Sequence, residues 1–185
     1  DNVALAKEID ADGVHVGQED MEAGDVRSLL GPDKIIGVSA HSVEEALLAE
    51  KQGADYLGSG SVFGTTTKKD VTALPLKMLR DICHAVQIPV VAIGGVSAEN
   101  IDQLVGCDVA GIAVVSAIFA QEEIETATEA LKAQVQEMLA KTEQFDALYK
   151  KLTPLLQGKK GVLFDMDGTL IDSMPMWRTL DVEYI

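Results

Sequence analysis

The sequence predicts an α/β fold built on a parallel sheet. Short apolar runs rich in Val and Ile alternate with longer stretches in which apolar residues recur at helical spacing. Each apolar run ends in a small cluster of polar residues or glycines, and an amphipathic stretch follows it. The order strand, polar loop, helix, strand is typical of right-handed βαβ units that cover a parallel sheet.

Five runs have the length and composition of strands in such a sheet. They lie at 13–17, 35–39, 55–60, 89–95 and 111–116. The carboxyl ends of parallel strands meet at one rim, which is where α/β barrels build their active sites. We therefore expect the residues that follow these runs to form a functional site.

Helices are predicted between the strands. Ser42 and Glu45 have the spacing of a capping box, and Gly53 marks the end of the helix that they begin. The chain opens in a helix that contains Val3 and Leu5. Later helices place apolar residues on one face, namely Leu76, Leu79, Ile82 and Val86, and then Ile124, Ala127, Leu131, Val135 and Met138.

Length limits how much of a barrel can form. A closed (β/α)8 barrel takes about 250 residues and rarely fewer than about 200, whereas the repeating pattern occupies residues 1–142. We therefore expect a partial TIM (β/α)8 barrel with about the last five β/α units, lacking the first three strands. An open barrel leaves an unpaired strand edge, so we also expect self-association into a homo-oligomer.

Composition excludes several classes of function. The chain has 47% hydrophobic and 24% charged residues, and no apolar run approaches the roughly 18 residues of a membrane helix. Cys83 and Cys107 are too few for a disulfide framework, so we expect reduced thiols and a cytoplasmic protein. The net charge of −15 argues against nucleic acid or an acidic membrane surface as a partner. Phosphate ligands remain compatible where metal ions, lysines or helix amino termini supply local positive charge.

Carboxylates and a hydroxyl are expected at the first strand ends of the rim. Asp20 follows the first run, and Asp1 is expected where the preceding strand would end. Carboxylates on adjacent strand ends can share one Mg²⁺, which often bridges to substrate phosphates. Ser39 adds a hydroxyl at the next strand end. His15, within a strand, is expected to be a hydrogen-bonded barrel residue rather than a base, while His41 beside Ser39 is a candidate for supporting the same site.

The later strand ends carry groups suited to phosphate. Thr65, Thr66 and Thr67 offer hydroxyls and amides next to Lys68, whose ammonium group acts as a point charge on phosphate. The last two runs end in Gly94-Gly95 and Val115-Ser116, the place where barrels commonly bind a phosphate through backbone amides. Glycine there allows close approach of the backbone.

Taken together, these motifs resemble the thiamine-phosphate synthase family from residue 1 to about residue 120. The shared segments are His15-Val16-Gly17-Gln18-Glu19-Asp20, Gly37-Val38-Ser39-Ala40-His41, Thr65-Thr66-Thr67-Lys68-Lys69-Asp70, Ala92-Ile93-Gly94-Gly95 and Val114-Val115-Ser116-Ala117-Ile118. Five motifs in the family's order and approximate spacing are far more specific than any one of them.

The resemblance implies an activity and a role for each motif. The family couples 4-amino-2-methyl-5-(diphosphooxymethyl)pyrimidine with thiazole phosphate, in the presence of Mg²⁺, to give thiamine monophosphate and pyrophosphate. By resemblance, Asp1 and Asp20 would bind the metal, and Ser39 and Lys68 would hold the pyrimidine diphosphate. The thiazole phosphate would be held by Thr65, Thr66, Thr67, Gly95, Val115 and Ser116.

Two departures from the family pattern carry expectations of their own. The segment from Gly60 to Thr65 lacks two prolines that family members usually have, so we expect a looser loop before Lys68. The family's Gln-Leu-Arg-Glu-Lys segment, which binds the same diphosphate, is absent, so we expect this chain alone to be inactive or nearly so.

Three other interpretations stay open. A thiazole tautomerase-like barrel shares the fold, but Lys68 with Asp20 favours diphosphate chemistry. A non-catalytic module could bind thiazole phosphate through Gly95, Val115 and Ser116 without turnover. The barrel could also be only the scaffold of a phosphatase.

The repeating strand and helix pattern of the sequence stops after residue 142. We expect a helical linker over 143–160, with Pro154 and the stretch from Gln157 to Gly161 marking a boundary. The segment Gly161-Val162-Leu163-Phe164-Asp165-Met166-Asp167-Gly168-Thr169-Leu170 then resembles the opening motif of haloacid dehalogenase-type phosphatases. The resemblance implies the first strand of a Rossmann-like domain over 161–185, truncated and inactive in this chain. It makes Asp165 the phosphoryl-accepting nucleophile and Asp167 the acid/base, with both as Mg²⁺ ligands.

Overall fold

Five parallel strands form one sheet whose spatial order follows the chain order, β1-β2-β3-β4-β5. The computed structural model describes residues 2–64 and 73–156, without the side chains of 148, 149 and 151–156. The strands are β1 (Gly13–Val16), β2 (Ile35–Ala40), β3 (Tyr56–Gly60), β4 (Val90–Ile93) and β5 (Gly111–Ala113). The helices are α1 (Val3–Glu8), α2 (Ala23–Leu30), α3 (Val43–Lys51), α4 (Leu76–Ala85), η1 (Ile101–Leu104), α5 (Ser116–Phe119) and α6 (Ile124–Leu156). The predicted α/β fold and its parallel sheet are confirmed.

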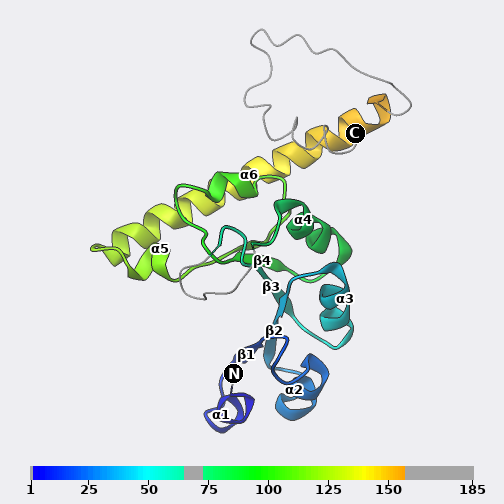
Figure 1. Ribbon diagram of the computed structural model, residues 1–185, viewed down its shortest axis with the longest axis vertical. Helices are drawn as coiled ribbons and strands as arrows, with labels where there is room; N and C mark the ends of the chain where they lie inside the picture. Colours follow the sequence, from blue (N-terminus) through cyan, green and yellow to red (C-terminus); the bar gives the residue numbers. More distant parts are fainter. Residues whose placement is uncertain (1, 65–72, 157–185) are drawn as a thin grey trace.

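The register of the sheet assigns alternate residues to two faces. Ile36 pairs with Val14, and Leu57 pairs with Val38 on one side and Val90 on the other. These side chains point toward the helices, and Ile36 and Leu57 are fully buried. Figure 1 shows α2, α3 and α4 side by side along this face. The opposite face carries His15, Gly37 and Tyr56, which lie in one row across three strands.

Two strands end earlier than their apolar runs. Gly94 and Gly95 have φ values of 90° and 69°, which end the extended conformation after Ile93. Val115 has φ −121° and ψ −70° and caps α5, so Ser116 begins a helix instead of ending a strand. The predicted limits of 89–95 and 111–116 were therefore too long at their carboxyl ends.

The predicted helix signals are largely confirmed. Ser42 Oγ accepts a hydrogen bond from Glu45 N, and the Glu45 carboxylate accepts one from His41 N, one residue before the usual partner in a capping box. Gly53, with φ 91°, follows the last turn of α3. Leu79 and Ile82 of α4 are fully buried, whereas Ile124, the first residue of α6, is 44% exposed.

Helix α6 continues through residue 142 and ends at Leu156. The buried Thr142 hydroxyl donates to Met138 O at 3.0 Å and accepts from Gly106 N at 3.1 Å, which anchors the helix to the loop after η1. Phe145 lies against Gly106, where an added Cβ would be 3.2 Å from its ring. Contacts with the barrel therefore continue past 142, and the domain limits expected there stay predictions. Residues 157–185 lie outside the described residues.

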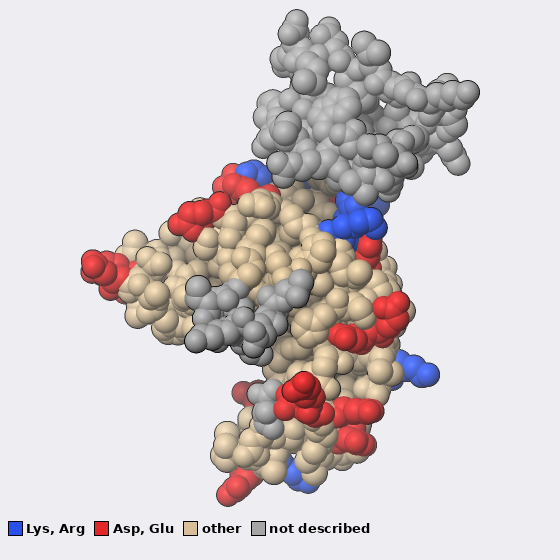
Figure 2. Space-filling view, in the orientation of Figure 1, with Lys and Arg blue, Asp and Glu red and all other residues tan. Residues whose placement is uncertain are grey.

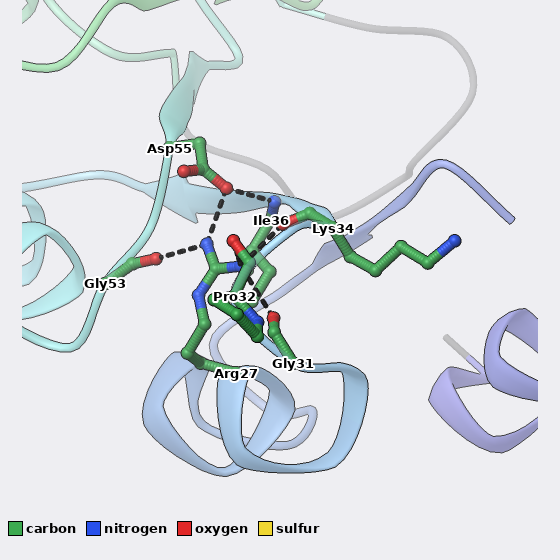
Figure 3. A network of polar contacts seen from close by, with 7 residues as sticks. All are labelled: Arg27, Gly31, Pro32, Lys34, Ile36, Gly53 and Asp55. Atoms are coloured by element: carbon green, nitrogen blue, oxygen red, sulfur yellow. Dashed lines mark hydrogen bonds and ion pairs between the residues drawn. The ribbon is translucent and has the colours of Figure 1, made fainter.

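Arg27 organises the end of the sheet opposite the rim. Its guanidinium donates to the carbonyl oxygens of Gly31 and Gly53 at 3.1 and 2.9 Å and to Asp55 Oδ2 at 2.6 Å. Asp55 Oδ2 also accepts from Ile36 N at 2.7 Å. Figure 3 shows that these groups surround one guanidinium, which also reaches the carbonyls of Pro32 and Lys34. Arg27 thereby ties the loops before β2 and β3 together.

Candidate active site at the carboxyl ends of the strands

The structure places the described members of the predicted site at one rim. Asp20 lies in the loop after β1, and Ser39 lies near the end of β2. Gly95 follows β4, and Val115 and Ser116 follow β5. Asp1, Thr65, Thr66, Thr67, Lys68, Asp165 and Asp167 lie outside the described residues, so their roles remain predictions.

Asp20 is held by the turn that carries it. Its Oδ2 accepts a hydrogen bond from Gly17 N at 2.7 Å, and its own N donates to Gly17 O at 3.2 Å. The hydrogen bond from Gly17 N lowers the pKa of the Asp20 carboxyl below its usual value. The group is therefore a carboxylate at neutral pH, the form that binds Mg²⁺.

The carboxylate of Asp20 suits a shared metal site. In residues 2–64 and 73–156 no group of three or more His, Cys, Asp and Glu side chains could hold a metal ion. Mg²⁺ in phosphate-transfer sites commonly takes only one or two carboxylates, with water and substrate oxygens as its other ligands. The Asp20 carboxylate could supply one ligand of such a site.

Ser39 is part of a hydrogen-bonded row across three strands. His15 Nε2 lies 3.0 Å from Ser39 Oγ, and His15 Nδ1 lies 3.0 Å from the Tyr56 hydroxyl. Burial lowers the pKa of His15, so the ring is neutral at neutral pH. The prediction that His15 is a hydrogen-bonded barrel residue is confirmed.

The row depends on two glycines and on a tyrosine that the sequence pattern did not single out. A Cβ on Gly58 would lie 3.1 Å from His15 Cε1, and a Cβ on Gly37 would lie 2.5 Å from His15 Nδ1. The absence of these side chains leaves room for the imidazole between Tyr56 and Ser39. These two glycines next to His15 were the signal in the sequence that could have indicated the hydrogen-bonded row.

Two further contacts order the first half of the rim. Gln18 Nε2 donates to the carbonyl oxygen of Ser39, which joins the loop after β1 to β2. His41 Nδ1 lies 3.2 Å from Glu45 Oε2, the same oxygen that accepts from His41 N. His41 is therefore engaged with the first turn of α3, and its predicted support of the site remains a prediction.

The loops after β3 and β4 pack closely together. Val62 N donates to Ile93 O and Phe63 N donates to Gly94 O, both at 3.0 Å. A Cβ on Gly95 would collide with the carbonyl oxygen of Gly64. The diglycine turn is thus in contact with the loop that leads into the predicted Thr65–Lys68 segment, and only glycine fits at Gly95.

The end of β5 completes the described rim. Val115 is 67% exposed and precedes Ser116, the first residue of the short helix α5. The Ser116 side chain is exposed as well. These positions leave both residues accessible to a ligand.

A cleft of about 110 Å³ lies beside Asp20 but on the helix side of the sheet. Val16 and Val38 form its floor, and Glu22, Glu45 and Gln52 are among its polar lining residues. Its carboxylates would repel a phosphate. Gly17, Gln18 and Asp20 also line this cleft, so it adjoins the candidate site at the end of β1.

Carboxylates predominate over basic groups on the face drawn in Figure 2, in keeping with the net charge of −15. Among the helices described, none is long and apolar enough to cross a membrane.

Comparison with known proteins identifies close relatives. The family model described as thiamine monophosphate synthase matches residues 1–118. A thiamine-phosphate synthase of Clostridium botulinum is 51% identical over 132 residues, which are 71% of this chain and 62% of the relative. One from Pyrococcus abyssi is 50% identical over 139 residues, which are 75% of this chain and 67% of the relative. The chain thus spans 62% to 67% of the length of these two proteins.

Solved structures agree on the fold. The thiamine phosphate pyrophosphorylase from Pyrococcus furiosus superposes with a TM-score of 0.68 at 47% identity, over 75% of this chain and 66% of that one. A 3-hexulose-6-phosphate synthase superposes with a TM-score of 0.55 at 17% identity, over 72% of this chain and 66% of that chain, a likeness of fold alone.

Proposed function

Because the chain belongs to the thiamine monophosphate synthase family, we propose that it forms the later strands and rim of a thiamine-phosphate synthase. The reaction joins the pyrimidine diphosphate to thiazole phosphate and releases pyrophosphate. The match of the family model over residues 1–118 carries this proposal. The rim geometry supports it, since Asp20, Ser39 and Gly95 all lie at the carboxyl ends of parallel strands.

The proposed mechanism relies on positioning and electrostatics. One Mg²⁺ held by Asp20, with Asp1, would neutralise charge on the diphosphate. Ser39 donates a hydrogen bond to that diphosphate, and Lys68 places a positive charge beside the departing pyrophosphate. As the bond to the diphosphate oxygen breaks, the methylene carbon of the pyrimidine becomes a benzylic-type cation, and the thiazole nitrogen then forms its bond to that carbon. No protein nucleophile takes part in this scheme.

The second substrate is assigned to the other half of the rim. Backbone amides around Gly95, Val115 and Ser116 would bind the thiazole phosphate, together with Thr65, Thr66 and Thr67. Val115 and Ser116 are exposed and Gly95 has no side chain, so a phosphate can approach the backbone closely.

The test follows product formation. Protein extended to the length of the relatives is mixed with both substrates and Mg²⁺, and thiamine monophosphate is measured by mass, with the 185-residue chain and Asp20→Ala in parallel. We expect product from the extended protein, loss of product in its Asp20→Ala variant and little or none from the 185-residue chain. Absence of product from well-folded extended protein would contradict the synthase proposal. Calorimetry then distinguishes a binding module, which would bind thiazole phosphate but not the pyrimidine diphosphate.

For residues 161–185 we propose the start of a haloacid dehalogenase-type phosphatase, with Asp165 as nucleophile and Asp167 as acid/base. The sequence from Phe164 to Leu170 is the support for this proposal. In a protein that carries the whole phosphatase domain, thiamine monophosphate is a candidate substrate because the synthase would release it nearby. A phosphate-release assay with that ester and an unrelated sugar phosphate tests the pairing, and rapid cleavage of the sugar phosphate alone would refute it.

A further inference from the structure

Asn100 holds the turn that follows β4. Its Nδ2 donates to the carbonyl oxygen of Gly95 at 2.8 Å, and its Oδ1 accepts from Ser97 N at 2.9 Å. One side chain therefore bridges two points of the loop that starts with the diglycine. Because one contact needs a donor and the other an acceptor, the orientation of the amide group is fixed.

The side chain of Asn100 serves the turn and not the helix that follows it. Asn100 stands at the N-cap position of η1, where Asn commonly accepts a hydrogen bond from the first helical amides. In this helix no such side-chain hydrogen bond forms. Both functions of the amide are instead directed at the loop between Gly95 and Ser97.

The diglycine turn is held from its other side as well. Phe63 N donates to Gly94 O at 3.0 Å, so the carbonyl oxygens of both glycines have donors. Within a trans peptide the N–H points away from the carbonyl oxygen. Fixing the Gly94 and Gly95 carbonyls therefore fixes the directions of the Gly95 and Val96 N–H groups, and no carbonyl in the described part of the chain accepts from these two amides.

Such restraint matters because glycine has little conformational preference of its own. Gly94 and Gly95 take φ values of 90° and 69°, a region that unrestrained glycines leave freely. Without its two outer hydrogen bonds the turn would sample other orientations of its amides. Binding a ligand that needs both amides would then carry the entropic cost of ordering them.

We propose that Asn100 is a positioning residue for phosphate recognition, fixing the diglycine turn so that its amides face the phosphate of the thiazole substrate. This inference rests on the proposed function for the identity of the ligand. It assigns to Asn100 a specific energetic role, namely affinity for the phosphate group rather than for the thiazole ring.

The variants follow from the hydrogen-bond pattern. Asn100→Asp keeps an acceptor for Ser97 N but sets a carboxylate oxygen against the Gly95 carbonyl oxygen. Asn100→Ala removes both contacts. Gln103→Ala is the matched control, since it removes an exposed amide side chain from the same short helix.

Calorimetry measures the affinity of each variant of the 185-residue chain for thiazole phosphate and for the corresponding thiazole alcohol. We expect both Asn100 variants to bind the phosphate ester about tenfold more weakly, the effect of about one well-made hydrogen bond, while affinity for the alcohol changes little and Asn100→Ala still unfolds in a single cooperative transition. Gln103→Ala should match the parent chain. Equal losses for ester and alcohol, or no loss for the ester, would overturn the role of Asn100.

A second measurement separates this inference from the proposed function. Inorganic phosphate is titrated while the amide NMR signals of Gly95 and Val96 are followed. If these signals shift in the parent chain and not in Asn100→Ala, the positioning role holds even if thiazole phosphate fails to bind, in which case the proposed function fails by itself. If the signals do not shift in the parent chain, or shift equally in both proteins, the positioning role is refuted.

Discussion

The Nε2 atom of His15 lies 3.0 Å from the Oγ atom of Ser39, and the opposite ring nitrogen lies 3.0 Å from the hydroxyl of Tyr56. Burial lowers the pKa of His15, so at neutral pH the ring is uncharged and carries one N–H. One hydroxyl therefore donates to the ring and the other accepts from it. The orientation of Ser39, which is expected to hold the diphosphate, is thus linked through His15 to Tyr56 on β3.

This link predicts coupling between Tyr56 and Ser39. Tyr56→Phe should lower the free energy of unfolding by about 1 kcal/mol, the net value of a typical hydrogen bond. It should also weaken binding of the pyrimidine diphosphate, though less than Ser39→Ala does. A double-mutant cycle on calorimetric affinities checks the link. If Tyr56→Phe costs as much affinity in the Ser39→Ala background as in the parent, Tyr56 does not act through Ser39.

Asp20→Asn should remove the metal dependence of diphosphate binding. The hydrogen bond from Gly17 N lowers the pKa of Asp20. The carboxylate therefore persists to lower pH than that of an ordinary aspartate. Its contribution to metal binding is lost only as pH falls through that lowered pKa. Affinity for the diphosphate, measured with and without Mg²⁺ from about pH 4, near the usual Asp pKa, to about pH 8, tests this, and the metal dependence of the parent chain should persist over the whole range. Glu19→Gln changes the neighbouring exposed acid and should leave the metal dependence intact. The same metal dependence in Asp20→Asn would show that Asp20 is not a ligand.

Arg27→Ala should destabilise the fold more than the loss of a single hydrogen bond does. The guanidinium donates to carbonyl oxygens in two loops and to the Asp55 carboxylate, and hydrogen bonds to charged groups contribute about 1.5–3 kcal/mol each. Water replaces some of the lost hydrogen bonds in Arg27→Ala, so we expect its free energy of unfolding to fall by about 3 kcal/mol. Arg27→Lys should recover only part of this loss because Lys lacks the planar set of donors. Urea denaturation measures both.

Lys34→Ala is the control for Arg27. Lys34 Nζ also makes an ion pair, 2.7 Å from Asp10 Oδ1, but the Asp10 side chain is 89% exposed. Exposed pairs of this kind contribute about 0–1 kcal/mol. Equal effects of Arg27→Ala and Lys34→Ala would mean that the network in Figure 3 adds no stability beyond a surface ion pair.

The contact between α6 and the barrel should weaken as pH rises through about 6. Burial and the neighbouring Asp108 carboxyl raise the pKa of Asp146 to about 6, while Lys150 and His84 act in the opposite direction. Because the folded-state pKa lies above the unfolded one, the folded state binds the proton more tightly, and this stabilisation is lost as pH rises from about 4 to above 6. Asp146→Asn should therefore raise the unfolding temperature at pH 7.5 (more than about one unit above that pKa) and have little effect at pH 4. A variant that is equally stabilising at both pH values would contradict this assignment.

Periodicity predicted the fold well because the buried face of the sheet is made of residues with a clear alternation. Ile36, Val38 and Leu57 all lie where the strand pattern puts them. Strand ends were less well predicted, since positive φ at Gly94 and the helical start at Ser116 interrupt apolar runs without a change in composition. The rim residues Asp20, Ser39 and Gly95 were predicted because strand order alone gathers them.

The contacts within the site were harder to predict. Tyr56 and Asn100 act through hydrogen bonds to His15 and Gly95, and such pairs depend on register and loop geometry rather than on composition. Tyr56 is 41 positions from His15 in the chain, so nothing local in the sequence joins them. The glycines around these contacts, which leave space for the side chains, were the weaker sequence signal for them.

Gly95→Ala separates backbone strain from steric collision at the phosphate turn. A Cβ at Gly95 would strike the Gly64 carbonyl oxygen, and the φ of 69° is unfavourable for alanine. Gly31→Ala has a φ of 88° but no atom within 4 Å of the added Cβ, so it reports the backbone cost alone, about 1 kcal/mol or more. Gly111→Ala, with open space and no positive φ, should be neutral or slightly stabilising. We expect the free energy of unfolding to be highest for Gly111→Ala, lower for Gly31→Ala and lowest for Gly95→Ala. Only Gly95→Ala should weaken binding of thiazole phosphate. If Gly95→Ala is no more destabilising than Gly31→Ala and binds the ester as the parent does, the turn is not held against the loop after β3, and its close packing has no part in recognising phosphate.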